Sequence, residues 1–275
     1  MLSADFQCRM TPGDLAFLQD ALGDDAPGDG ELTQLLVEDE DYRAGVLGDP
    51  RAFEAAMSRD DLMTVVSPRL FFEILLRRTA SDLERVRHTV ERTGSDRVPV
   101  FDAAEVAELT GKPSVLHYLA TLLASFTKVH SHTERVWVRR GVVRKVRYSD
   151  LDVHSMLRLA RETDEHERLP VIRRTADLCL FIVGMFPDFA ASAHRYPGTG
   201  TLRAQSAARR RLGTEEYENV ASQMYALAAQ YREGDEIGEV FHTLGEHVVE
   251  AKKPINFLSE HYLGYKREQL FGMAG

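Results

Sequence analysis

The chain has 275 residues, a formal net charge of −9 at pH 7 and 44% hydrophobic residues, which is ordinary for a globular protein. Two cysteines are too few for a disulfide framework or a cysteine-based zinc site. The start MLSADFQCRMTPGD lacks the basic and apolar parts of a secretory signal. The longest apolar run, 178–186, has nine residues, whereas a membrane-spanning helix needs about 20. We therefore expect a soluble, cytoplasmic protein that does not enter a membrane.

Helix signals dominate the amino-terminal half of the chain. Ser67 can cap the clearest helix, Pro68 suits its first turn, and Gly94 can end it. Apolar residues recur there at helical spacing, so one face should enter the core. The segment KPSVLHYLATLLASFTKVH is apolar nearly all round between residues 115 and 129, which predicts a deeply buried helix. Further helices are expected near 14–22, 31–40, 50–58 and 102–110, with loops at 23–30 and 94–99.

Residues 134–148 are the exception to this helical pattern. The stretch RVWVRRGVVRKVRY carries β-branched and aromatic residues on both sides of Gly141, which favours a two-stranded hairpin. Such a hairpin is only marginally stable alone, so it should lean on neighbouring helices. It should present a basic ribbon made of Arg135, Trp137, Arg139, Arg140, Arg144, Lys145 and Arg147.

Helix signals resume after the hairpin. A helix should open at Ser149, because the aspartates of SDLDVHSMLRLAR suit a helix amino terminus. Further helices are expected near 171–186, 201–212, 214–231, 235–251 and 255–263.

The predicted fold class is mainly α: a multi-helix array with one short basic β-hairpin near 134–148. The sequence shows no fixed repeat and no linker rich in proline, glycine and serine. A single helical domain over 1–275 is the simplest interpretation. A subdivision at the hairpin, into 1–132 and 149–275, stays open.

Three segments carry a resemblance. SPRLFFEILLRR, SDLD and RRTADLCLFIVGMFPD together resemble an uncharacterised family of mostly helical bacterial proteins. In that family an SP-x-LFF-like helix precedes an arginine-rich patch and an LF-x-x-G-x-FP-like segment. The resemblance would cover about residues 33–250 and implies a similar fold. It assigns no ligand and no catalytic residue.

The basic ribbon is the first candidate for function. Arginine binds phosphates through two hydrogen bonds and stacks on bases, and β-ribbons enter DNA grooves. The alternative is a solvated hairpin whose arginines pair with acidic segments of the same chain, such as VEDEDYR or ETDEHE.

A metal site is the second candidate. Glu239 and His242 have ExxH spacing, and Glu246 lies one turn beyond on the same helix face. These residues make half of a dimetal-carboxylate site, but no second ExxH motif supplies the other half. The alternative is an amphipathic helix with its polar residues in solvent. The pair His130 and His132 provides too few ligands for a defined site.

A ribonuclease pattern is weaker. Arg161 with His166, and Arg147 with His154, have spacings that resemble the R-x4-6-H motif of small helical HEPN nucleases. In such a site the histidine would transfer protons and the arginine would stabilise phosphate charge. Chance alone predicts about as many matches in a chain this rich in arginine and histidine.

Asp177 is the last candidate. It lies beside the apolar run of RRTADLCLFIVGMF, where a carboxylate is costly unless it is paired. Arg173 and Arg174, one turn earlier, predict a partly buried structural ion pair rather than a catalytic acid.

The motifs that the chain lacks narrow the choice. It has no phosphate-binding G-x-x-x-x-G-K-[ST], no G-x-G-x-x-G, no G-x-S-x-G and no H-E-x-x-H. We therefore expect a binding or interaction module without a cofactor, whose basic hairpin contacts an acidic protein or nucleic acid. Homo-oligomerisation stays open. The alternative is a metal-dependent helical-bundle enzyme using Glu239, His242 and Glu246, followed by a HEPN-like ribonuclease.

Overall fold

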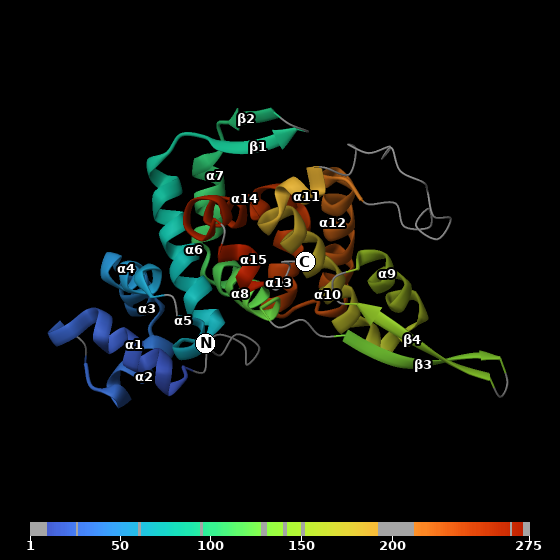
Figure 1. The fold of residues 1–275 in the computed structure, drawn as a ribbon, viewed down its shortest axis with the longest axis horizontal. Coiled ribbons are helices and arrows are strands. Elements are labelled where there is room, and N and C mark those ends of the chain that lie inside the picture. Colours follow the sequence, from blue (N-terminus) through green and yellow to red (C-terminus); the bar gives the residue numbers. More distant parts are fainter. Residues whose placement is uncertain are drawn as a thin grey trace.

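The computed structural model describes residues 10–25, 27–59, 62–93, 96–127, 131–139, 142–149, 152–191, 212–264 and 266–271. These residues form a mainly α-helical body with two short antiparallel hairpins at its edges (Figure 1). The mainly α fold class is thus confirmed. In the described ranges, no helix combines the length and the apolar character that crossing a bilayer requires.

The amino-terminal helices form a lobe at one end of the body (Figure 1). Thr11 and Asp14 close a capping box at the start of the first helix, and Asp39 and Asp49 cap two later ones. Because Asp39 accepts a hydrogen bond from the backbone of Tyr42, a new helix begins where the sequence predicted the end of one. The helices are α1 (Pro12–Leu22), α2 (Asp29–Glu38), α3 (Glu40–Leu47), α4 (Pro50–Ser58) and the short α5 (Leu62–Val65).

Helix α6 (Pro68–Arg85) begins as predicted, with the Ser67 hydroxyl accepting a hydrogen bond from the backbone of Leu70 at 3.2 Å. Its predicted end at Gly94 is wrong. The helix stops at Arg85, and β1 (Thr89–Thr93) pairs with β2 (Asp96–Val100), so that Thr89 lies opposite Val100. The expected loop at 94–99 is therefore mostly strand.

Distant residues hold this first hairpin in place. The Thr89 hydroxyl donates to Asp102 Oδ1 at 2.6 Å. The Lys253 ammonium, 3% exposed, pairs with Glu91 at 2.8 Å and also with Asp102. Lys253 is 151 positions from Asp102, so local sequence signals could not reveal this contact.

The remaining helices pack with α6 around one large hydrophobic cluster of the described residues, and Leu83, Val106 and Ala107 form a small separate cluster beside it. Within the large cluster, Phe126 stacks on Phe181 with ring centroids 4.2 Å apart. The helices are α7 (Ala103–Gly111), α8 (Pro113–Ser125), α9 (Val153–Glu162), α10 (Arg168–Met185), α11 (Pro187–Ala191), α12 (Thr214–Tyr231), α13 (Glu236–Glu246), α14 (Val248–Leu258) and α15 (Lys266–Leu270), with 3-10 turns η1 (Gly23–Asp25) and η2 (Glu165–Glu167) and a π-helical turn η4 (Ser259–Leu263).

Three helix predictions need correction or lie outside the description. The helix predicted to open at Ser149 begins at Val153, because Asp152 caps it and accepts a hydrogen bond from the backbone of His154 at 3.2 Å. The helix predicted over 235–251 is divided at His247. The helix predicted over 201–212 falls almost wholly outside the described residues.

A close backbone approach joins α12 to α13. A Cβ atom at Gly238 would lie 2.0 Å from the Arg232 carbonyl oxygen, so only glycine fits there without moving the backbone. Asp235 caps α13 by accepting from the Gly238 amide at 3.0 Å. Because the turn is tight, it fixes the position of Arg232, the residue that directly follows α12.

The second hairpin confirms the prediction near 134–148. Strand β3 (Ser131–Arg139) pairs antiparallel with β4 (Val142–Ser149), with a bulge between Trp137 and Arg139. Both strands extend away from the helical body, and the base of β4 lies beside α9 (Figure 1). Residues 140 and 141, at the predicted turn, lie outside the described residues.

Candidate functional site

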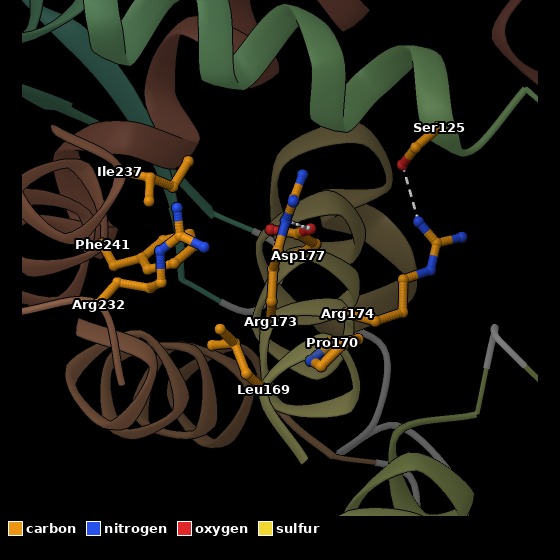
Figure 2. Close-up of a pocket in the computed structure, with 9 residues that line it drawn as sticks. All are labelled: Ser125, Leu169, Pro170, Arg173, Arg174, Asp177, Arg232, Ile237 and Phe241. Carbon is orange, nitrogen blue, oxygen red and sulfur yellow. Dashed lines mark hydrogen bonds and ion pairs between the residues drawn. The ribbon is translucent and has the colours of Figure 1, made fainter. Parts of the chain in front are cut away.

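A pocket of about 370 Å³ opens between α8, α10 and α13. Its size falls in the range of about 300–1,000 Å³ that is typical of small-molecule sites. Figure 2 shows the side chains around it, which come from three helices and from the turn after α12. The lining residues are Ser125, Leu169, Pro170, Arg173, Arg174, Asp177, Arg232, Ile237 and Phe241.

Helix α10 supplies the polar centre of the pocket. Pro170, Arg173, Arg174 and Asp177 follow the i, i+3, i+4, i+7 spacing that places residues on one face of a helix. The rest of α10, from 175 to 185, is buried in the core. The helix therefore anchors the pocket rigidly while its first turns face the opening.

Asp177 lies at the base of the pocket and is only 4% exposed. Its Oδ1 accepts hydrogen bonds from the hydroxyls of Tyr118 at 2.5 Å and Tyr225 at 2.8 Å. Its Oδ2 lies 3.5 Å from Arg173 Nε. One carboxylate thus joins α8, α10 and α12, and the predicted ion pair with Arg173 is confirmed.

Burial raises the pKa of Asp177 more than Arg173 and the two tyrosines lower it, so its net pKa lies above the ordinary value. Burial, and next the charge of Asp177, also raise the pKa of Tyr118 and of Tyr225 well above 10.0. A buried carboxylate that its surroundings do not fully compensate, in a pocket, is a physical sign of a functional site.

Other contacts orient the arginines of the pocket. Arg174 donates to the Ser125 hydroxyl at 2.7 Å and lies 3.7 Å over the Phe126 ring. Arg232 donates to Asp235 Oδ2 at 2.7 Å. The guanidinium groups are thus held in place before any ligand arrives.

The lining combines positive charge with an apolar wall. Three guanidinium groups and one carboxylate line the pocket, and Asp235 beside it pairs with one of the three, Arg232, so these side chains together still carry a positive charge. Arginine suits phosphate and carboxylate oxygens because its donors form a planar fork. The chemistry of the pocket therefore fits a small anion that also has an apolar part. The apolar wall is Leu169, Pro170, Ile237 and Phe241.

A second buried charge cluster lies apart from the residues that line this pocket. The Arg43 guanidinium contacts both carboxylate oxygens of Glu73, with Nε at 2.6 Å from Oε1, and both side chains are almost fully buried. Arg77 bridges Glu73 at 2.9 Å and Glu40 at 2.7 Å. His117 Nε2 lies 3.0 Å from Glu40 Oε2. This cluster joins α3, α6 and α8 and has a structural role.

The residues predicted to form the basic ribbon lie on β3 and β4, except Arg140, which is outside the described residues. The register sets Arg135 opposite Lys145, Thr133 opposite Arg147, and Val136 opposite Arg144. Arg135 and Lys145 are therefore two positive residues at directly opposed positions. Glu134 is the single acidic residue of these two strands.

The predicted metal residues lie on α13. His242 Nδ1 pairs with Glu246 at 3.2 Å, and these side chains are 64% and 62% exposed. Glu239 is also exposed. Across the described ranges, no three histidine, cysteine, aspartate or glutamate side chains gather in a way that could hold a metal ion. The surface geometry fits the alternative of a solvated helix face.

Three of the remaining sequence candidates, Arg161, His154 and His166, are exposed and are not among the residues that line the pocket. Arg161 and His166 are exposed, the first on α9 and the second in the 3-10 turn η2. Arg147 is on β4 and His154 is exposed on α9. His130 is outside the described residues, and His132 is on β3.

Sequence reasoning missed Tyr118, Tyr225, Arg232 and Phe241 as parts of a site. One signal was present for Tyr118. The helix around it was predicted to be buried on all sides, and a buried hydroxyl must find a hydrogen-bond partner. For the other three, the sequence carries no local sign of which helices would meet.

No protein-family model matches this chain, and no curated protein or solved structure does so either. The resemblance to a helical bacterial family therefore stays a prediction.

Proposed function

We propose that this protein is a binding protein for a small anionic ligand, and that the α8–α10–α13 pocket is its binding site. The observation that carries the proposal is the lining itself, which brings Arg173, Arg174 and Arg232 together around an opening with one lining carboxylate, Asp177. Two further features support it. The volume suits a small molecule, and buried Asp177 has a raised pKa beside the opening.

Replacing Arg174 with glutamine tests this function. Thermal unfolding of the variant checks that the fold survives the loss of the contacts with Ser125 and Phe126. A hydrogen bond to a charged group contributes about 1.5–3 kcal/mol. We therefore expect the affinity for inorganic phosphate, measured by calorimetry at constant ionic strength, to fall by about 10- to 100-fold.

The matched control is Arg161→Gln, an exposed arginine on α9 that changes the net charge equally. It should bind phosphate as the parent does. If Arg174→Gln and Arg161→Gln bind phosphate equally well, or the parent binds none, the pocket is not an anion site.

A second candidate function is the one that the sequence predicts, a contact between the basic hairpin and an anionic macromolecule. The strand register favours it. Like charges directly opposite one another destabilise a ribbon, and Arg135 is paired with Lys145. An anionic partner would remove that repulsion. Nucleic acid supplies a regular row of such charges.

Intrinsic fluorescence can test the hairpin, because Trp137 is the only tryptophan in the chain. Adding a single-stranded 12-mer oligonucleotide should change its emission, and the affinity should fall with salt by about 0.7 log units per log unit for each phosphate contacted. The double variant Arg135→Ser/Lys145→Ser should bind more weakly by at least tenfold.

The control for the hairpin is Arg87→Ser/Arg161→Ser, which removes the same charge from exposed positions outside the ribbon. Equal weakening by both double variants would mean that net charge alone attracts the oligonucleotide. Binding to a polyglutamate peptide but not to the oligonucleotide would assign the ribbon to an acidic protein instead.

A further inference from the structure

We propose that Arg173 is the residue through which the α8–α10–α13 pocket binds its anion, and that Asp177 competes with that anion for the Arg173 guanidinium. This inference rests on the proposed function, because it assigns the contact and the regulation of the same site. Asp177 is a positioning residue, which acts on the ligand through Arg173. Because Asp177 is only 4% exposed, we assign it no contact with the ligand.

The contacts of the other two pocket arginines leave Arg173 as the anion contact. Arg174 donates to the Ser125 hydroxyl at 2.7 Å and has further interactions. Arg232 donates to Asp235 at 2.7 Å and likewise has further interactions. Both of these guanidinium groups are therefore already engaged by the protein, and they contribute positive charge around the opening.

Arg173 keeps donors for a ligand. Its Nε lies 3.5 Å from Asp177 Oδ2, which is longer than an ordinary hydrogen bond, and its guanidinium carbon lies 5.3 Å from the centroid of the Tyr118 ring. A guanidinium has five N–H donors in a fork that matches a carboxylate or phosphate group. The side chain is 38% exposed, and Figure 2 shows it on the α10 face that borders the pocket. An anion in the pocket can therefore approach the terminal nitrogens of Arg173.

Asp177 is held where it opposes such an anion. Its Oδ1 accepts hydrogen bonds from the Tyr118 and Tyr225 hydroxyls, which fix the carboxylate at the base of the pocket. Its Oδ2 is the counter-ion of Arg173. An anion on the terminal nitrogens of Arg173 would share that guanidinium with Oδ2, and two negative groups so close together repel each other. The ionised carboxylate therefore lowers the affinity for the anion.

Protonation of Asp177 removes this competition. The titratable and charged groups around its carboxyl group are Tyr118 on α8, Arg173 and Arg174 on α10, Tyr225 on α12 and, across the pocket, Arg232 with its partner Asp235 before α13. Burial raises the pKa of Asp177 more than the arginines of α10 and the two tyrosines lower it, so the net pKa lies above 3.8. As the pH falls through that raised pKa, Arg173 loses its internal counter-ion and the affinity for the anion rises.

Calorimetric titration with sodium sulfate tests the competition, because the charge of sulfate does not change between about pH 4.5 and 8. At constant ionic strength, the affinity of the parent should rise by about fivefold or more as the pH falls over this range. In Asp177→Asn the affinity at about pH 8 should already match that of the parent at the acid end, and it should not change with pH. Arg173→Gln should bind sulfate about tenfold more weakly than the parent at every pH.

Two further variants support the assignment to Asp177. Asp235→Asn replaces the carboxylate that pairs with Arg232 and keeps a side chain that can cap α13, so the rise in affinity toward low pH should persist. Tyr225→Phe removes one hydroxyl that stabilises the ionised Asp177, so the rise in affinity should begin at a higher pH than in the parent. Thermal unfolding of each variant at each pH checks that the fold is kept, and Tyr225→Phe decides the outcome if Asp177→Asn does not fold.

The outcomes separate this inference from the proposed function. If Arg174→Gln weakens phosphate binding but the sulfate affinity of the parent is independent of pH, or its pH dependence survives in Asp177→Asn, the competition is excluded and the anion site stands. Equal sulfate binding by Arg173→Gln and the parent would exclude Arg173 as the contact. If the parent binds neither sulfate nor phosphate, both proposals fail.

Discussion

Replacing Glu73 with glutamine is expected to lower the free energy of unfolding by about 3–5 kcal/mol, the range found when one partner of a buried ion pair is removed. Glu73 is fully buried on α6, and Arg43 on α3 is 3% exposed. The two-point contact of Arg43 with Glu73 would be lost, so a guanidinium would remain in the interior without its carboxylate. Arg77 and His117 would lose the same partner.

Chemical denaturation in urea measures this change. The matched control is Glu108→Gln on α7, an exposed glutamate, which should change the free energy of unfolding by less than about 0.5 kcal/mol. A loss below about 1 kcal/mol for Glu73→Gln would show that the cluster does not hold α3 against α6.

A double replacement distinguishes the loss of the ion pair from the cost of leaving one buried charge without its partner. In Arg43→Met/Glu73→Leu both charges leave together, so no charge remains unpaired. We expect this variant to be more stable than either single variant, because apolar groups often replace a buried ion pair with little loss. Additive losses in the double variant would contradict that interpretation.

Stability should also depend on pH through the same cluster, with opposite signs for its acids and its histidine. Burial would raise the pKa of Glu73, but hydrogen bonds from Arg43 and His117 outweigh it and lower that pKa. Burial would likewise raise the pKa of Glu40, but hydrogen bonds from His117 and Arg77 outweigh it and lower that pKa. Their contribution is therefore present above pH 4.5. It is lost as the pH falls through the pKa values of the folded state.

His117 acts in the other direction. Burial would lower its pKa, but hydrogen bonds to Glu40 and Glu73 and the charge of Glu73 raise it above 6.5. The stabilisation by the protonated imidazole is complete below pH 6.5 and is lost as the pH rises through the raised pKa. Urea unfolding at a series of pH values should show a maximum between about pH 4.5 and 6.5 from this cluster.

The variant His117→Gln measures how much of the pH dependence of stability comes from His117. It should flatten the decline of stability between pH 6.5 and 8.5 while leaving the decline in acid. The control His242→Gln removes an exposed histidine of α13 and should leave both declines as they are. If the alkaline decline persists in His117→Gln, another group causes it.

The buried carboxylates Glu73 and Asp177 show why burial alone does not identify a functional site. The net pKa of Glu73 is lowered, because its cations outweigh burial, whereas that of Asp177 is raised. Glu73 therefore contributes to stability as a charge. At Asp177, which lies at the base of a pocket, burial outweighs the stabilisation of the charged form by Arg173 and the two tyrosines.

Local sequence determined most of the helices. Ser67 with Pro68 fixed the start of α6, and Gly141 amid valines and arginines indicated the second hairpin, because capping, turn geometry and side-chain periodicity act over a few residues. The pairing of Arg173 with Asp177 was also accessible, since it spans one helical turn.

Tertiary structure decided the rest. The strands β1 and β2 depend on Lys253 and Asp102, and the pocket depends on α8, α12 and α13 meeting α10. Tyr225 and Asp177 are 48 positions apart, and nothing within one turn of either indicates the other. Contacts at such separations follow from how apolar faces pack together, which no local pattern encodes, and so the candidate site emerged only from the fold.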